Sequence, residues 1–361
     1  MQHEAEDDGQ ALRPVDPGVA IENPAPFPQA SDLGVPPLVR RERRIPEGRP
    51  YRERERDRRA AEQRWGPPRA DLDARMALRA AIAFALALAV AIFIFGLSLT
   101  PDRFLVVLLV PALAIRRPGR YLLDFLPFAA LIILYAECRG LAHMVHPVPH
   151  YLPQLRAEKF LFAGHLPTVD LQDWLWSGDP RLFDRAVLYV TRIHSIVPMS
   201  IAFALWLKRR ALFYRFAVTF LTLSFAAALT FWLFPSAPPW AAAEKGLVNV
   251  TKIGGTHVAT SSVQTGGGTI YRLIHGNPYA AIPSLHGGYA FLIFLFVATL
   301  AWRAGRRRLT IGLAALYPAL QSFAVLYTGN HYVVDLLIGF AYATAAFLGV
   351  QWCWRRLGLP E

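Results

Sequence analysis

Long apolar runs separated by short, basic segments constrain this chain of 361 residues more than any other feature. A helix needs about 20 apolar residues to cross a bilayer, and most runs after residue 76 reach that length. Because the bilayer core holds no water, a spanning backbone must satisfy its own hydrogen bonds, as a helix does. We therefore predict an all-α fold, a polytopic membrane helical bundle with about eight transmembrane helices. The predicted spans are 77–99, 103–115, 121–141, 187–207, 211–234, 281–301, 309–328 and 332–354.

The charges between these runs predict their orientation. Eight spans leave both termini on one side, where the short connectors are rich in Arg and Lys. Basic short loops are retained in the cytoplasm, so we expect cytoplasmic termini and long outer loops at 142–186 and 235–280. The run at 103–115 is short, and it is either a thin span or a re-entrant segment. We expect an integral protein of a bacterial inner (plasma) membrane whose long loops face the periplasm or the outside.

The net charge of +12 does not indicate a nucleic-acid partner. Residues 1–75 hold 14 Arg against 15 acidic residues, so the excess lies in residues 76–361, mostly in the short loops. The first 75 residues contain few large apolar side chains that could offset the entropy of ordering. We expect 1–75 to be a disordered Arg/Pro-rich cytoplasmic tail and 76–361 to form the transmembrane domain.

Two clusters of polar residues at the starts of predicted spans carry the chemistry. Pro283-Ser284-Leu285-His286 opens the sixth span, and Gly329-Asn330-His331-Tyr332-Val333-Val334-Asp335 opens the eighth. The two histidines are 45 positions apart, which fits one helical hairpin that leaves the outer face and returns to it. Ionisable groups within spans are costly and are usually functional. We therefore expect both histidines at the same outer membrane level.

These residue types favour phosphoryl transfer. His331 and Asp335 are four apart and share one helix face, so the carboxylate fixes the imidazole tautomer and frees the other nitrogen as a nucleophile. His286 on a neighbouring helix is placed to protonate the leaving oxygen. Ser284 and the free amides at the helix start form an anion site. The combination predicts a phosphohistidine intermediate.

The same motifs resemble those of the type-2 phosphatidic acid phosphatase superfamily, most closely its inositol phosphorylceramide synthase-like branch. The likeness rests on PSLH at 283–286, TGNH at 328–331 with HYVVD at 331–335, FPSAPPW at 234–240 and GHLPT at 164–168. It implies a helical bundle with a six-helix catalytic core, a metal-independent reaction without cofactors, and a phospholipid or lipid phosphate as substrate. It also implies His331 as nucleophile, Asp335 as its partner and His286 as proton donor.

The chain departs from the phosphatase branch in its cations. That branch has Ser-Arg ahead of the last motif, where this chain has Ala324 and Val325. A Lys208-x6-Arg215 match to its first motif lies on the predicted cytoplasmic side, so we treat it as coincidence. Transition-state charge still requires cations. The outer-side candidates are Arg272, which we favour, and Arg192, Lys245 and Lys252; Asn330 and His275 complete the predicted substrate-binding set.

Several alternatives stay open on the sequence. Water as acceptor makes a plain phosphatidic acid or polyprenyl phosphate phosphatase, whereas an alcohol makes a phosphotransferase. A transporter that uses the same histidines as a proton relay is a third possibility. His143, His146, His150 and His165 have the elements of a zinc site, but we interpret them as interfacial histidines and predict no metal. The lipid bilayer and a membrane lipid are the expected partners; the oligomeric state is not predicted.

Overall fold

The computed structural model of the protein describes residues 105–114, 118–145, 148–254, 277, 279–305 and 308–359, without the side chains of 114 and 143–145. All of them belong to one compact unit, Arg56–Glu361. The described residues are helical apart from loops and two isolated parallel bridges that join Ser236 to His150 and to Ala280. The predicted all-α fold is confirmed. The predicted tail 1–75 and the predicted span 77–99 lie outside the described residues.

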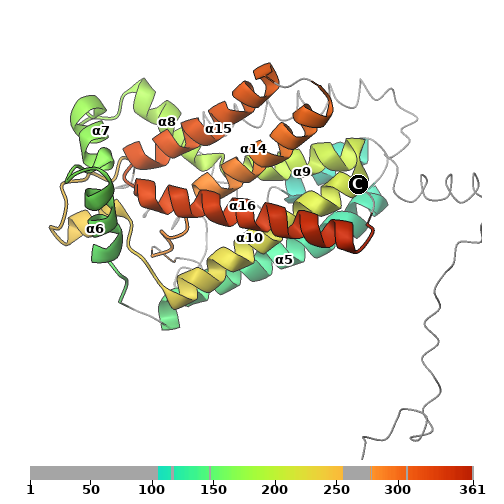
Figure 1. The fold of residues 1–361 in the computed structure, drawn as a ribbon, viewed down its shortest axis with the longest axis horizontal. Coiled ribbons are helices and arrows are strands. Elements are labelled where there is room, and N and C mark those ends of the chain that lie inside the picture. The colour runs from blue at the N-terminus through green and yellow to red at the C-terminus, as the bar shows by residue number, and fades with distance from the viewer. Residues whose placement is uncertain are drawn as a thin grey trace, which may run out of the picture. The chain divides into compact units, whose positions relative to one another are not determined.

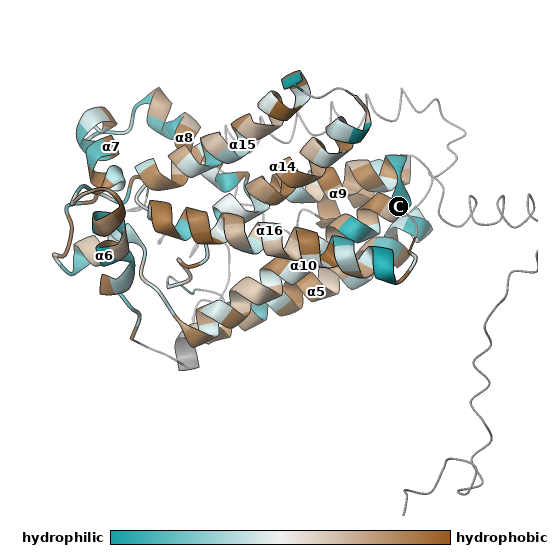
Figure 2. Cartoon of the chain, viewed as in Figure 1, coloured by the Kyte–Doolittle hydropathy of each residue, from teal (hydrophilic) through white to brown (hydrophobic). Residues whose placement is uncertain are grey.

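Five helices are long and apolar enough to cross a membrane. Figure 1 shows them lying roughly side by side, and Figure 2 shows hydrophobic ribbon along their middles with hydrophilic ribbon toward the end marked C. They match five predicted spans, which confirms an integral membrane bundle. The five are α5 (Pro118–Val145), α10 (Arg210–Leu233), α14 (Leu285–Arg303), α15 (Arg308–Tyr327) and α16 (Val333–Arg356).

The predicted short run 103–115 is described from residue 105 to 114. This part contains α4 (Leu109–Ala114), whose six residues are too few to cross a bilayer. It is therefore not among the candidate spans of the described chain.

The predicted span 187–207 is wrong as one continuous helix. The chain forms α8 (Leu182–Arg192) and α9 (Ile196–Lys208), which are bent by 52° at the break between them. Pro198 lies in the first turn of α9, where its missing N–H and its ring are tolerated; it would interrupt a helix that continued from α8. The bent pair counts as a sixth span if it crosses the membrane as a unit.

Large aromatic side chains fill the interior between the long helices. The ring of Phe220 on α10 stacks on that of Tyr289 on α14, with centroids 4.3 Å apart. The Tyr289 hydroxyl is also 2.8 Å from Ser224 Oγ. These contacts tie α10 to α14 and hold the helix that begins with the PSLH motif in the centre of the bundle.

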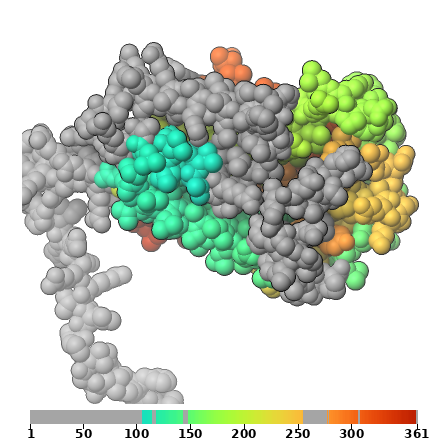
Figure 3. Space-filling view, turned by 180° about the vertical axis from the view of Figure 1, so that it is seen from behind, coloured from blue at the N-terminus to red at the C-terminus, as the bar shows by residue number. Residues whose placement is uncertain are grey.

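Short helices gather at the end of the bundle where α16 begins (Figure 1). They are α6 (Leu152–Leu161), α7 (Pro167–Leu175) and α11 (Pro239–Glu244). The view from behind in Figure 3 also places the residues around 240–254 beside α7 and α8. Leu171, Trp174 and Leu175 lie on α7, and Trp174 is 79% exposed, as an interfacial residue would be.

Candidate active site

The starts of α14 and α16 touch through their backbones. The amide of Ser284, the N-cap of α14, donates to the carbonyl oxygen of Asp335 at 3.0 Å. This approach requires glycine one turn further along α16, because a Cβ on Gly339 would lie 2.3 Å from the Ser284 carbonyl oxygen. Gly288 on α14 is packed less tightly but also has little room, since its Cβ would meet the Gly339 carbonyl oxygen at 3.3 Å.

This contact brings the two motif histidines together. His286 Nδ1 lies 3.1 Å from His331 Nε2, and His331 Nδ1 lies 3.4 Å from Asp335 Oδ2. A carboxylate oxygen only accepts, so His331 carries its proton on Nδ1 and keeps a lone pair on Nε2. That lone pair accepts the N–H of His286 in this state. Asp335 is fully buried and His331 is 5% exposed, so few water molecules compete for these groups.

A third histidine lies against this pair. The ring centroid of His194 is 4.0 Å from that of His286. His194 Nδ1 lies 2.8 Å from the Thr191 carbonyl oxygen, which the break between α8 and α9 leaves available. The carbonyl can only accept, so Nδ1 donates and Nε2 keeps its lone pair.

Arg139 is a cation of this site that sequence reasoning missed. It lies on α5 within electrostatic reach of both His194 and His286. Its side chain donates to the Asn277 carbonyl oxygen at 3.4 Å, and the Asn277 side chain donates back to the Arg139 carbonyl at 2.9 Å. These bonds join α5 to the segment ahead of the PSLH motif. The available signal was an arginine near the outer end of the predicted span 121–141, a position that is usually functional.

The turn before His331 is held by the short helices. Gly329 has φ of +74°, a conformation that favours glycine, and its carbonyl accepts from the Trp240 amide at 3.1 Å. The Thr168 hydroxyl donates to the His331 carbonyl at 3.4 Å. The Gln172 side chain donates to the Tyr327 carbonyl at 2.8 Å and also bonds Thr251 through both of its polar atoms. The nucleophile candidate therefore lies on a turn with little freedom to move.

Glu158 on α6 also binds the start of α16, and no sequence pattern pointed to it. Its two carboxylate oxygens accept the amides of Val333 and Val334 at 3.0 and 3.1 Å. The side chain is fully buried. Burial raises the pKa of Glu158, the two amide bonds oppose that rise, and the nearby charge of Asp335 adds to it.

The remaining predicted site residues are distributed unevenly. Ser284 is fully buried and its hydroxyl accepts from the Gly287 amide at 3.4 Å, as a helix cap does. Asn330 donates to the Thr328 hydroxyl at 2.8 Å beside His331.

Arg192 ends α8, with no hydrogen bond or ion pair to the histidines in the described structure. Arg272 and His275 lie outside the described residues.

The lysines expected as alternative cations take other positions. The Lys252 ammonium lies over the Trp240 ring, 3.6 Å from its centroid, and Lys245 is exposed at the end of α11. In the part of the chain that the structure describes, no contact joins either lysine to the histidine pair.

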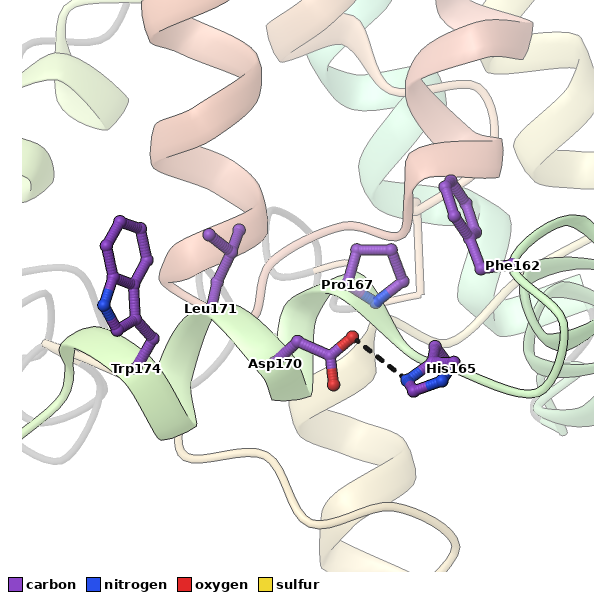
Figure 4. A pocket seen from close by; sticks show the side chains of 6 residues that line it. All are labelled: Phe162, His165, Pro167, Asp170, Leu171 and Trp174. Carbon is purple, nitrogen blue, oxygen red and sulfur yellow. Dashed lines mark ion pairs between the residues drawn. The ribbon is translucent and has the colours of Figure 1, made fainter.

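The histidines considered for zinc do not form a cluster where the structure describes them. His150 stacks on Phe234 with centroids 4.3 Å apart, and His165 pairs with Asp170 at 3.7 Å. Figure 4 shows the latter pair in an open groove of about 490 Å³, beside apolar side chains of α7. No group of three His, Cys, Asp or Glu side chains fit for a metal is found among the described residues; the His143 and His146 side chains lie outside them.

Comparison with known proteins gives one family and one curated relative. The family model of the PAP2 superfamily matches residues 167–349. The phosphoinositol dihydroceramide synthase of Bacteroides thetaiotaomicron is 29% identical over 161 residues, which cover 42% of this chain and 51% of the relative. The chain thus matches about half the length of that relative. No solved structure matches the chain significantly.

Proposed function

Because the chain belongs to the PAP2 superfamily and is a membrane enzyme of it, we propose that it transfers a phosphoryl-containing group between lipids through a phosphohistidine. The observation that carries this proposal is the chain of contacts from Asp335 through His331 to His286. It supplies an oriented imidazole, a lone pair on its second nitrogen, and a neighbouring proton donor. The family match and the synthase-named relative also favour an enzyme over the transporter alternative.

The first half-reaction is attack on the donor lipid. His331 Nε2 forms a bond to phosphorus, the bond from phosphorus to the lipid oxygen breaks, and His286 gives its proton to that leaving oxygen. In-line attack places the entering and leaving atoms on opposite sides of phosphorus. The 3.1 Å contact between the rings therefore belongs to the resting state, and the substrate phosphate has to separate them.

The second half-reaction returns the enzyme to its starting state. An acceptor hydroxyl attacks phosphorus, its proton passes to His286, and the bond to His331 breaks. Arg139 is placed to stabilise the charge on the phosphoryl oxygens in both steps. It supplies the positive charge that the phosphatase motifs would provide at positions where this chain has Ala324 and Val325.

An alcohol acceptor fits this chain better than water. The relative is named as a synthase of phosphoinositol dihydroceramide, a lipid that carries a phosphoinositol group. The chain also lacks the arginine ahead of the last phosphatase motif. We therefore place a phosphorylated polyol as the transferred group and a lipid hydroxyl as the acceptor. Hydrolysis of a lipid phosphate remains the second candidate, because it uses the same catalytic residues.

A product assay in detergent with EDTA tests the proposal. Wild type is incubated with a panel of phospholipids and lipid phosphates, with and without lipid alcohols, and both transfer product and free phosphate are measured. Transfer that depends on the added alcohol and on His331 supports the proposal; phosphate release alone supports the hydrolase. His331→Ala should be inactive, and the matched control His165→Ala, at an exposed histidine on the same side, should keep full activity. Full activity of His331→Ala would exclude the mechanism.

A further inference from the structure

A carboxylate from outside the membrane-spanning helices holds the first turn of α16. Glu158 lies on the ten-residue helix α6, and its two oxygens bind the amides of Val333 and Val334. The first amides of a helix have no partner within the helix and must find one elsewhere. Here the partner comes from a distant part of the chain and is fully buried against the helix end.

Two carboxylates together hold three consecutive amides. The Tyr332 amide donates to Asp335 Oδ2 at 2.9 Å, and the same oxygen faces His331 Nδ1 at 3.4 Å. Glu158 holds the next two amides. The turn that carries the His331 imidazole is therefore held by both Asp335 and Glu158. A shift of Glu158 would tilt this turn.

Glu158 also acts on the site through its charge. The titratable groups that face it are Asp335 and Tyr332, both at the start of α16. The interaction between the Glu158 and Asp335 carboxylates is repulsive, and burial strengthens it. This repulsion acts on Asp335, the residue whose Oδ2 faces His331 Nδ1 at 3.4 Å.

The residues on the buried face of α6 indicate a role beyond packing against α16. Its buried face consists of Gln154, Leu155 and Glu158, so two of the three residues are polar. Gln154 is 1% exposed, and neither polar atom of its side chain has a hydrogen-bond partner in the described structure. Buried polar groups reduce stability unless they are paired. An apolar face would hold α6 against α16 more firmly, but it could not bind the amides.

We propose that Glu158 is a positioning residue that orients the first turn of α16 and, with it, the His331 imidazole. The inference rests on the proposed phosphohistidine mechanism for its consequence in catalysis. It predicts that Glu158 affects the turnover number rather than the binding of substrate, because the side chain acts through the α16 amides and Asp335.

Two variants change the charge and the length of the Glu158 side chain in turn. Glu158→Gln removes the charge and leaves one acceptor oxygen, and we expect kcat to fall about 10- to 100-fold with KM little changed. Glu158→Asp keeps the charge but is one methylene shorter, so it no longer reaches both amides and kcat should fall as well, again with KM little changed. Glu244→Gln, the same change at an exposed site on α11, is the matched control and should match wild type.

A measurement without substrate separates this inference from the proposed function. The imidazole signals of His331 are recorded by NMR on histidine-labelled protein in detergent, for wild type, Glu158→Gln and Glu244→Gln, with His331→Ala to assign them. A changed chemical shift of His331 in Glu158→Gln alone supports the inference even if the wild-type enzyme shows no transfer. Unchanged His331 signals, wild-type kcat, or failure of both Glu158 variants to fold would overturn it, the last because Glu158 would then be purely structural.

Discussion

Replacing Gly339 by Ala tests whether a backbone contact sets the spacing of the histidines. The new Cβ would lie 2.3 Å from the Ser284 carbonyl oxygen, and real Cβ atoms essentially never approach below 3.0 Å. The atom that it meets is backbone, so no side-chain rotation relieves the clash. Ser284 is two residues before His286, and Gly339 is one turn after Asp335, so the strain arises at the level of the site.

The geometry gives the size of the effect. The starts of α14 and α16 must separate by at least about 0.7 Å to restore an allowed contact, and a misplacement of about 1 Å costs roughly 100-fold in rate. Overpacking in a tight interface also destabilises by about 1–3 kcal/mol. We therefore expect Gly339→Ala to lose one to two orders of magnitude in kcat, with a lower Tm in detergent.

Gly349→Ala is the control on the same helix. A Cβ at Gly349 meets nothing within 4 Å, and Ala is favoured over Gly in a helix by up to about 1 kcal/mol. This variant should keep full activity and an equal or higher Tm. Measurement of kcat and thermal unfolding on both variants decides the matter. Wild-type activity and Tm in Gly339→Ala would refute the claim that this contact positions the histidines.

Four further predictions follow from the site. Asp335→Asn keeps an acceptor for the Tyr332 amide but no longer fixes the His331 tautomer. Steady-state kinetics should show kcat lower by about 10³ or more, and an unchanged Tm should show that the variant still folds. Arg139→Gln should reduce kcat/KM by about 100-fold and weaken inhibition by vanadate, which mimics a phosphoryl group. Lys245→Gln, at an exposed site, should change neither quantity. His194→Phe keeps a ring against His286 but lacks nitrogens; a shifted pH–rate profile is expected, and an unchanged profile would make His194 a packing residue only. The raised pKa of Glu158 means that the folded protein binds a proton more tightly there than the unfolded chain, whose value is near 4.5. Stability should therefore fall as pH rises above about 4.5, and Glu158→Gln should flatten this part of the curve of Tm against pH.

The lengths of the apolar runs and the spacing of the motifs were enough to predict the spanning helices and the meeting of the two motif histidines. A run of about 20 apolar residues has few folded alternatives to a spanning helix. One hairpin between His286 and His331 returns the chain to the same level. His331 lies in the turn just before α16 rather than on a helix face, and the spacing of four still lets Asp335, in the first turn of α16, reach it. These relations are local or follow from one helical hairpin, so the sequence alone expresses them.

The rest depends on contacts between distant segments. Glu158 binds the amide of Val333, which lies 175 residues further along the chain. No local sequence pattern at either residue predicts this contact. Arg139 joins the site because α5 ends beside the segment ahead of the PSLH motif, which no periodicity encodes. The break that exposes the Thr191 carbonyl to His194 was missed because the run 187–207 is apolar enough to read as one helix, although Pro198 marks the new start.

Trapping of the covalent intermediate tests the central claim most directly. A donor lipid labelled in its phosphate is mixed with wild type, His331→Ala and His165→Ala, and the reaction is stopped in alkali, where a bond from phosphorus to imidazole nitrogen survives and a phosphate ester of serine does not. The account predicts label on wild type and His165→Ala that acid removes, that maps to the peptide containing His331, and that an added lipid alcohol discharges. Absence of label on active wild type, or equal labelling of His331→Ala, would contradict it.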